Sequence, residues 1–171
     1  RVMLSPDALA EVFGLLAWGS FGKRPQETHT SGLLRLLSGD ETLSSMLTVA
    51  EDTAGGLGPA FTSDGFRKPD RVALIEAGRH VGSLVSPRSA KEYGVPTNGA
   101  SDNEAPEALW MAPGDLTDAD ALARLGTGLY VSNLWYLNWS DKPAGRITGM
   151  TRFATMWVQD GEIVHLWTTG V

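Results

Sequence analysis

The feature that most constrains the fold is a pair of long runs, rich in aromatic and β-branched residues, near the end of the chain. The first run covers residues 126–139 and the second covers residues 146–159. Asp160-Gly161 follows the second run, and this dipeptide favours a tight hairpin turn because both residues accept a positive φ. The pattern predicts three successive antiparallel strands, at residues 128–139, 147–159 and 162–168.

Both faces of the first two predicted strands carry apolar side chains. In the first strand one face carries Leu129, Val131, Trp135, Leu137 and Trp139, and the other carries Tyr130, Leu134 and Tyr136. In the second strand Met150, Ala154, Met156 and Val158 oppose Ile147, Phe153 and Trp157. Long strands with two apolar faces indicate the centre of a sheet or a subunit interface, and we expect cover on both sides. Each such side chain contributes about 1.5–3 kcal/mol when it is fully buried.

The rest of the chain predicts short helices and one further hairpin. Helices are expected at residues 6–19 after a Ser5 cap, at 31–37, at 87–93 after a Ser86 cap, and between Thr117 and Gly126. A polar loop is expected at 23–30, a strand at 46–49, a glycine-rich loop at 51–65, a hairpin at 71–85 and an edge strand at 108–111. This order predicts an α+β fold with a mostly antiparallel β-sheet core, in a single domain over residues 1–171.

Composition excludes several classes of function. The formal net charge is −6, which argues against non-specific binding to nucleic acid or to an anionic membrane. No stretch has the length of a membrane span, and no signal peptide opens the chain, so a bacterial cytoplasmic location is expected. There is no cysteine, which excludes disulfides and thiolate ligands within this chain. Because Arg1 is not an initiator methionine, we expect a processed, trimmed or partial chain.

The sequence offers no built-in catalytic or metal site. Its three histidines, His29, His80 and His165, lack the spacing of a zinc motif. The carboxylate pairs Glu51-Asp52 and Asp102-x-Glu104 fall in predicted loops, where solvated acids are the expected interpretation. No nucleophile elbow and no phosphate-binding glycine loop occur. We therefore predict no catalytic residue and no metal ligand in this chain.

Arginine and aromatic side chains supply the candidate binding residues. Arg146 and Arg152 flank the middle predicted strand, where they could reach a carboxylate on a peptide substrate or across an interface. We predict that Arg146, Arg152 and Tyr136 contact substrate. Trp135 and Trp139 are the predicted interface residues, because aromatic side chains concentrate in partner surfaces.

Several segments together resemble the C-terminal half of the TldD/PmbA metallopeptidase family. They are Leu4-Ser-Pro-Asp-Ala-Leu-Ala, Ser63-Asp-Gly-Phe, Ala73-Leu-Ile-Glu-Ala-Gly, Ser86-Pro-Arg-Ser-Ala-Lys-Glu-Tyr-Gly-Val-Pro-Thr-Asn-Gly, Gly128-Leu-Tyr-Val, Thr148-Gly-Met-Thr-Arg and Trp157-Val-Gln-Asp-Gly-Glu-Ile. The resemblance extends from about residue 3 to about residue 165. The order and spacing of the segments make it specific, although each segment alone is weak.

The resemblance implies a β-rich domain of a peptidase system. In that family a TldD-type subunit carries a His-Glu-x-x-x-His zinc motif and acts on peptides. It pairs with a PmbA-like (TldE) subunit that lacks the metal ligands, and the two enclose a shared cavity. This sequence contains neither that motif nor the cysteine that TldD-type members add to the zinc site.

The resemblance therefore implies a PmbA/TldE-like subunit or domain without metal, whose zinc lies in a TldD-like partner. The expected assembly is a heterodimer or higher, its substrate is a peptide or amide, and some relatives suggest a bacterial antibiotic or other natural-product pathway. A scaffold or binding module with no hydrolytic role remains the alternative. A third hypothesis is a metal-free hydrolase that uses loop carboxylates such as Glu51 and Asp52.

Overall fold

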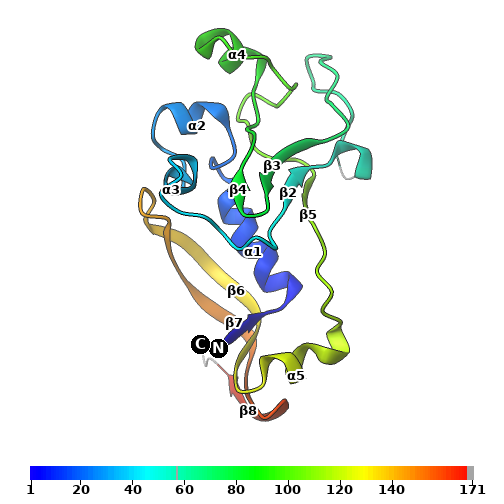
Figure 1. The fold of residues 1–171 in the computed structure, drawn as a ribbon, viewed down its shortest axis with the longest axis vertical. Helices are drawn as coiled ribbons and strands as arrows, with labels where there is room; N and C mark the ends of the chain where they lie inside the picture. Colours follow the sequence, from blue (N-terminus) through cyan, green and yellow to red (C-terminus); the bar gives the residue numbers. More distant parts are fainter. Residues whose placement is uncertain (57, 169–171) are drawn as a thin grey trace. The chain divides into compact units, whose positions relative to one another are not determined.

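The computed structural model describes residues 1–56 and 58–168, and this part of the chain divides into two compact units (Figure 1). The meander unit contains Arg1–Leu15, Gly114–Ser140 and the described residues from Ile147 onward. The loop-rich unit contains Leu16–Pro113 and Asp141–Arg146. Each unit is built on its own four-stranded sheet.

The sheet of the meander unit has the strand order β1-β6-β7-β8. Its strands are β1 (Val2–Leu4), β6 (Gly128–Asp141), β7 (Arg146–Gln159) and β8 (Glu162–Thr168). β1 pairs in parallel with β6, and β7 pairs antiparallel with β8. The turn between β7 and β8 has φ of 52° at Asp160 and 83° at Gly161, as the dipeptide predicts. The three predicted strands are confirmed.

Polar caps fix both helical segments of the meander unit. Helix α1 (Pro6–Ala17) begins after Ser5, whose Oγ accepts a hydrogen bond from Ala8 N at 3.1 Å and donates one to the Ser132 carbonyl on β6. The helix is two residues shorter than predicted, because it ends before Gly19, where φ is 78°. The 3-10 turn η2 (Asp118–Asp120) leads into α5 (Ala121–Leu125), which lies against β8. The predicted Thr117 cap is confirmed, since its Oγ1 accepts from Asp120 N at 3.3 Å.

The sheet of the loop-rich unit is antiparallel and has the order β4-β3-β2-β5. Its strands are β2 (Val49–Glu51), β3 (Val72–Glu76), β4 (Arg79–His80) and β5 (Leu109–Met111). β2 and β3 supply a core of Val49, Ala50, Leu74 and Ile75, all of them buried. β5 is an edge strand and β3–β4 is a hairpin, as predicted, whereas β2 begins three residues later than the predicted strand at 46–49.

The helices of the loop-rich unit are short: α2 (Lys23–Glu27), α3 (Leu34–Leu37), the 3-10 turn η1 (Thr53–Gly55) and α4 (Pro87–Tyr93). The prediction for α4 is confirmed, with a Ser86 cap and a left-handed Gly94 at its end. The predicted polar loop at 23–30 is wrong for residues 23–27, which form α2 with an i,i+4 ion pair between Lys23 and Glu27, whereas residues 28–30 lie outside helices and strands. The predicted helix at 31–37 retains only its last turn, and η1 interrupts the predicted loop at 51–65. None of these three changes affects the α+β class or the mostly antiparallel sheets, which are confirmed.

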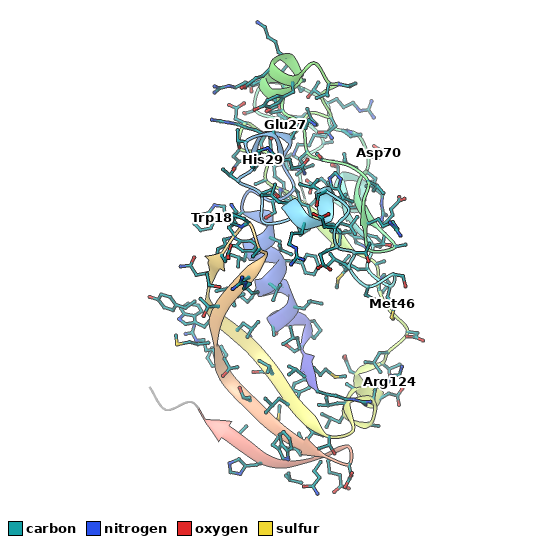
Figure 2. All side chains as sticks on the ribbon, turned by 60° about the vertical axis from the view of Figure 1, so that its left-hand side comes forward. Trp18, Glu27, His29, Met46, Asp70 and Arg124 are labelled. Carbon is teal, nitrogen blue, oxygen red and sulfur yellow. The ribbon has the colours of Figure 1, made fainter. Side chains whose placement is uncertain are left out.

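The sheet of the meander unit carries an exposed apolar surface, so the expectation of cover on both sides is wrong for this chain alone. Figure 2 shows side chains extending from both sides of the β6, β7 and β8 ribbons. The exposed large apolar side chains of these three strands are Trp135, Tyr136, Ile147, Met150, Phe153, Trp157, Ile163, Val164 and Leu166. The other interpretation of the pattern, strands at an interface, stays a prediction, and an exposed apolar surface of this kind is typical of a contact surface.

Candidate functional site

Four side chains on two neighbouring strands form one group on the exposed sheet, which we call the aromatic–arginine cluster. It consists of Trp135 and Tyr136 on β6 and Arg152 and Phe153 on β7. The Arg152 guanidinium carbon lies 3.8 Å from the centre of the Trp135 ring and 4.7 Å from that of Phe153. Trp135 and Tyr136 meet edge to face, with their ring centres 5.7 Å apart. The cluster thus holds one cation against two aromatic rings, and a third ring packs on the first.

The backbone of this cluster is strained at two positions. Tyr136 has φ of 52° and Phe153 has φ of 61°, although neither is a glycine. A left-handed conformation costs an L-residue roughly 1–2 kcal/mol, and in a strand it interrupts the two-residue alternation of side chains, as in a β-bulge. Both side chains are largely exposed, 74% for Tyr136 and 65% for Phe153, so burial of their rings does not compensate for the strain. Backbone strain that is not offset by packing of the side chain is typical of binding sites.

The other predicted site residues do not join this cluster. Arg146 belongs to the loop-rich unit, and its guanidinium lies 3.5 Å from the carboxylate of Asp141. Trp139 is half-buried on β6. Of the five predicted binding residues, the cluster brings together Trp135, Tyr136 and Arg152. Phe153 was missed as a site residue, because strand alternation gives no sign of its left-handed φ.

Two carboxylates that the sequence placed in solvated loops are buried. Glu104 has 1% of its surface exposed. Its Oε1 accepts from Ser86 N at 2.9 Å and from Ser86 Oγ at 3.0 Å, and its Oε2 accepts from Arg24 N at 2.8 Å. Both oxygens therefore have partners, and Glu104 ties the start of α2 to the start of α4. Its role is structural, and the expectation of a solvated acid at this position is wrong.

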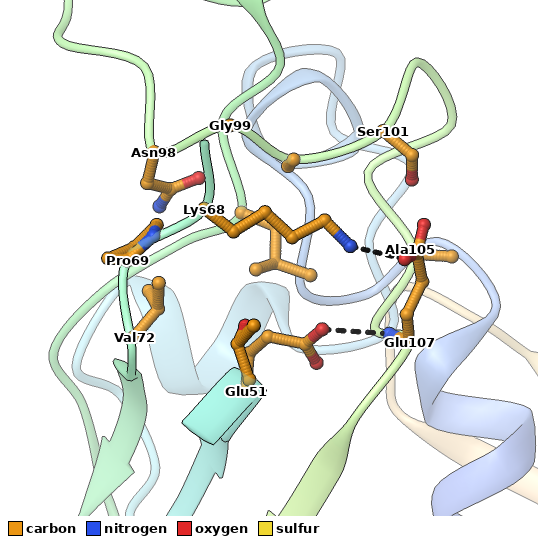
Figure 3. Close-up of a pocket in the computed structure, with 12 residues that line it drawn as sticks. Glu51, Lys68, Pro69, Val72, Asn98, Gly99, Ser101, Ala105 and Glu107 are labelled. Carbon is orange, nitrogen blue, oxygen red and sulfur yellow. Dashed lines mark hydrogen bonds and ion pairs between the residues drawn. The ribbon is translucent and has the colours of Figure 1, made fainter. Parts of the chain in front are cut away.

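Glu51 is the second buried carboxylate, and it lies at the end of β2 rather than in a loop (Figure 3). Its Oε1 accepts from Glu107 N and from Ala108 N, each at 3.0 Å. Nearby, the Lys68 ammonium is also buried and pairs with the carboxylate of Glu107. The cavity between these groups has a volume of about 10 Å³, which is about the space of one water molecule. It therefore offers no space for a substrate.

His80 forms a polar group with Ser83 and Gln26. Ser83 Oγ donates to Gln26 Oε1 at 2.5 Å and lies 3.3 Å from His80 Nε2. Because its proton is directed at the amide, Ser83 does not form the serine–histidine pair of a nucleophilic hydrolase. Burial lowers the pKa of His80 below its usual value, a hydrogen bond with the Gly82 backbone opposes this, and the Lys23 charge lowers the pKa further.

We expect His80 to make the protein less stable at acid pH. Because its pKa is lower in the folded chain than 6.5, the unfolded chain takes up this proton first as the pH falls. The stabilising contribution is complete above about pH 6.5 and is lost as the pH decreases through the pKa of the folded state. Urea unfolding of His80→Gln should show a weaker loss of stability between about pH 7.5 and about pH 5 than the unchanged chain. An unchanged pH profile in this variant would contradict the assignment.

The described ranges contain no group of three or more His, Cys, Asp or Glu side chains that could hold a metal ion. His29 and His80 border one open groove, together with Lys23 and Ser83, but they form no such group. Of the helices at residues 1–56 and 58–168, none has the length and apolar character to cross a membrane.

A family comparison accounts for the whole chain. Residues 1–170 match the model of the PmbA/TldA metallopeptidase C-terminal domain. A comparison with curated proteins finds no match.

Solved structures with the same fold agree with this match. TldE from Thermococcus kodakarensis is 18% identical with a TM-score of 0.75, over 97% of this chain and 42% of its own. A candidate modulator of DNA gyrase from Thermotoga maritima is 16% identical with a TM-score of 0.75, over 96% of this chain and 39% of its own. A protein with a similar description from Bacteroides thetaiotaomicron is 16% identical with a TM-score of 0.76, over 96% of this chain and 36% of its own. The chain thus spans about two fifths of the length of these relatives.

Proposed function

Because the chain belongs to the PmbA/TldA metallopeptidase C-terminal domain family, we propose that it is part of a zinc peptidase but binds no metal itself, as a TldE-like subunit does. In this proposal a TldD-like partner holds the zinc ion and a glutamate base, and together with this chain it forms a heterodimer or higher assembly. The zinc would polarise the attacking water and the scissile carbonyl of a peptide or amide. This chain would contribute one wall of the substrate cavity.

The observation that carries the proposal is a family match over residues 1–170 in a chain that lacks a ligand set. The part of the chain that the structure describes offers no cluster of metal-binding side chains, and the sequence contains no His-Glu-x-x-x-His motif and no cysteine. The carboxylates of Glu51 and Glu104 are occupied by backbone N–H groups, so neither is free to act as a base. These facts favour hydrolysis in a partner over hydrolysis by loop carboxylates of this chain.

The exposed sheet supports the role of a wall. Large apolar side chains on β6, β7 and β8 need a covering molecule, because patches of this kind rarely remain open on monomeric proteins. Trp135 and Trp139 are proposed to contact the partner, and Arg146, Arg152 and Tyr136 are proposed to contact substrate. A cytoplasmic location and a role in a bacterial natural-product pathway belong to the same proposal and are based on the resemblance.

Co-expression with a homologue that carries His-Glu-x-x-x-His tests the proposal. We expect the two chains to co-purify and to hydrolyse peptides that neither chain hydrolyses alone. Replacing the motif glutamate of the homologue with glutamine should remove hydrolysis and leave the complex intact. Failure to form a complex, together with no gain in hydrolysis, would end the proposal.

A scaffold function remains a second candidate, and the exposed Trp135 and Tyr136 rings favour it equally. In that case a double variant, Trp135→Ala with Tyr136→Ala, would abolish binding to the partner, and the complex that the unchanged chain forms would have no peptidase activity.

A further inference from the structure

We propose that the aromatic–arginine cluster binds the terminal carboxylate of a peptide, and that the rings of Tyr136 and Phe153 receive the apolar side chain next to it. The inference deepens the proposed function, on which it depends for the idea that the ligand is a peptide. It assigns the carboxylate of the ligand to Arg152 and the apolar side chain of the ligand to the exposed rings of Tyr136 and Phe153.

The first step concerns the charge of Arg152. None of the ion pairs among residues 1–56 and 58–168 includes this guanidinium, and its contacts are the faces of the Trp135 and Phe153 rings. Other cations in the chain pair with acids, such as Lys23 with Glu27 and Arg35 with Glu41. A guanidinium held against aromatic faces keeps its in-plane N–H groups for an acceptor. Arg152 is therefore a positioned cation that lacks its anion.

The second step concerns the kind of anion. Two parallel N–H groups of a guanidinium match the two oxygens of a carboxylate, which makes the pair both strong and directional. The cluster contains one cation, and the chain has a net charge of −6, so it repels polyanions such as nucleic acids. A single carboxylate is the ligand whose charge and shape match this site.

The third step concerns the two exposed rings. Tyr136 and Phe153 are neighbours in sequence of Trp135 and Arg152, and each is held at a positive φ in a largely exposed position. Glycine would adopt this backbone conformation without strain, so the aromatic side chains are retained against a conformational cost. Rings beside a carboxylate-binding arginine would contact the apolar side chain of the same ligand residue.

The test is a binding measurement on residues 1–171, without partner and without zinc. The probe is N-acetyl-Gly-Phe with a free carboxylate, and its C-terminal amide is the matched ligand control. NMR shifts of the tryptophan indole N–H signals report binding. We expect the acid to bind about tenfold more tightly than the amide, as the loss of one charge-assisted interaction predicts. Equal affinity for acid and amide would overturn the proposal.

Variants separate the contribution of Arg152 to binding from the contribution of the aromatic rings. Arg152→Gln should remove the preference for the acid, whereas Arg88→Gln, which changes an exposed arginine on α4 of the loop-rich unit, should preserve it. Tyr136→Gly should weaken binding of the acid while the melting temperature stays the same or rises, because glycine relieves the strained φ. Tyr136→Ala should weaken binding to the same extent without that gain in stability. Unchanged binding in Arg152→Gln would contradict the proposal.

The two proposals fail separately in these experiments. If the partner fails to form a complex but the free chain prefers the acid, only the proposed peptidase role is lost. If an active complex forms but the acid and the amide bind equally to the free chain, the cluster is not a carboxylate site.

Discussion

Replacing Glu104 with alanine is expected to lower the free energy of unfolding of the loop-rich unit by about 4 kcal/mol. The carboxylate accepts three hydrogen bonds, from Arg24 N, Ser86 N and Ser86 Oγ, at 2.8 to 3.0 Å. The alanine variant leaves these donors without their acceptor in a buried place, and each unsatisfied buried donor costs about 1–3 kcal/mol. Urea denaturation followed by circular dichroism measures the difference in stability.

Asp102→Ala is the matched control, because Asp102 precedes Glu104 by two residues and is exposed. Its stability should remain within about 0.5 kcal/mol of the unchanged chain. The loss of stability in Glu104→Gln should lie between the losses in Glu104→Ala and Asp102→Ala. The amide oxygen can still accept a hydrogen bond, but the amide nitrogen cannot accept one from Arg24 N or Ser86 N. A cost below about 1 kcal/mol for Glu104→Ala would show that these hydrogen bonds do not hold α2 and α4 together.

Glu107→Ala is expected to destabilise the same unit by about 3 kcal/mol, because it leaves the Lys68 ammonium buried without a counter-ion. The Lys68 side chain is only 6% exposed, whereas that of Glu107 is 37% exposed. Because Lys68 is more deeply buried than Glu107, we expect removal of Glu107 to cost more stability than removal of Lys68. Lys68→Met replaces the buried cation with an apolar side chain and leaves a carboxylate that water reaches, so we expect a cost below about 1 kcal/mol.

The double variant, Lys68→Met with Glu107→Ala, completes the comparison. Its stability should be close to that of Lys68→Met, because no unpaired cation remains after the lysine is replaced. The midpoint of urea unfolding should therefore rise when Lys68→Met is added to Glu107→Ala. Equal costs for the two single variants would mean that water reaches the Lys68 ammonium despite its buried position.

Local signals in the sequence predicted the elements that depend on neighbouring residues. Alternating apolar residues and Asp160-Gly161 predicted β6, β7 and β8, since strand period and turn chemistry are both short-range properties. Ser86 and Gly94 predicted the ends of α4 for the same reason, because the cap accepts a nearby backbone N–H and glycine adopts the left-handed end. The order of these elements predicted the α+β class, and the resemblance added the family, which the match over residues 1–170 confirms.

Tertiary partners decided the features that the sequence did not reveal. Glu104 and Glu51 are buried because distant backbone N–H groups need acceptors, and no local pattern shows which groups those are. The left-handed φ of Tyr136 and Phe153 is invisible in a two-residue alternation, so the sequence did not predict that their rings turn away from regular strand positions. Arg152 was predicted as a binding residue together with Arg146, but in the structure it stacks on the Trp135 ring, whereas Arg146 lies near Asp141.

The zinc content of the purified chain, alone and in complex with a metal-binding homologue, tests the central claim most directly. After equilibration with zinc and dialysis, we predict far less than one equivalent on the chain alone and one equivalent on the complex. Replacing the motif histidines of the homologue should remove the zinc from the complex. One tightly held zinc per chain in the absence of any partner would contradict the account.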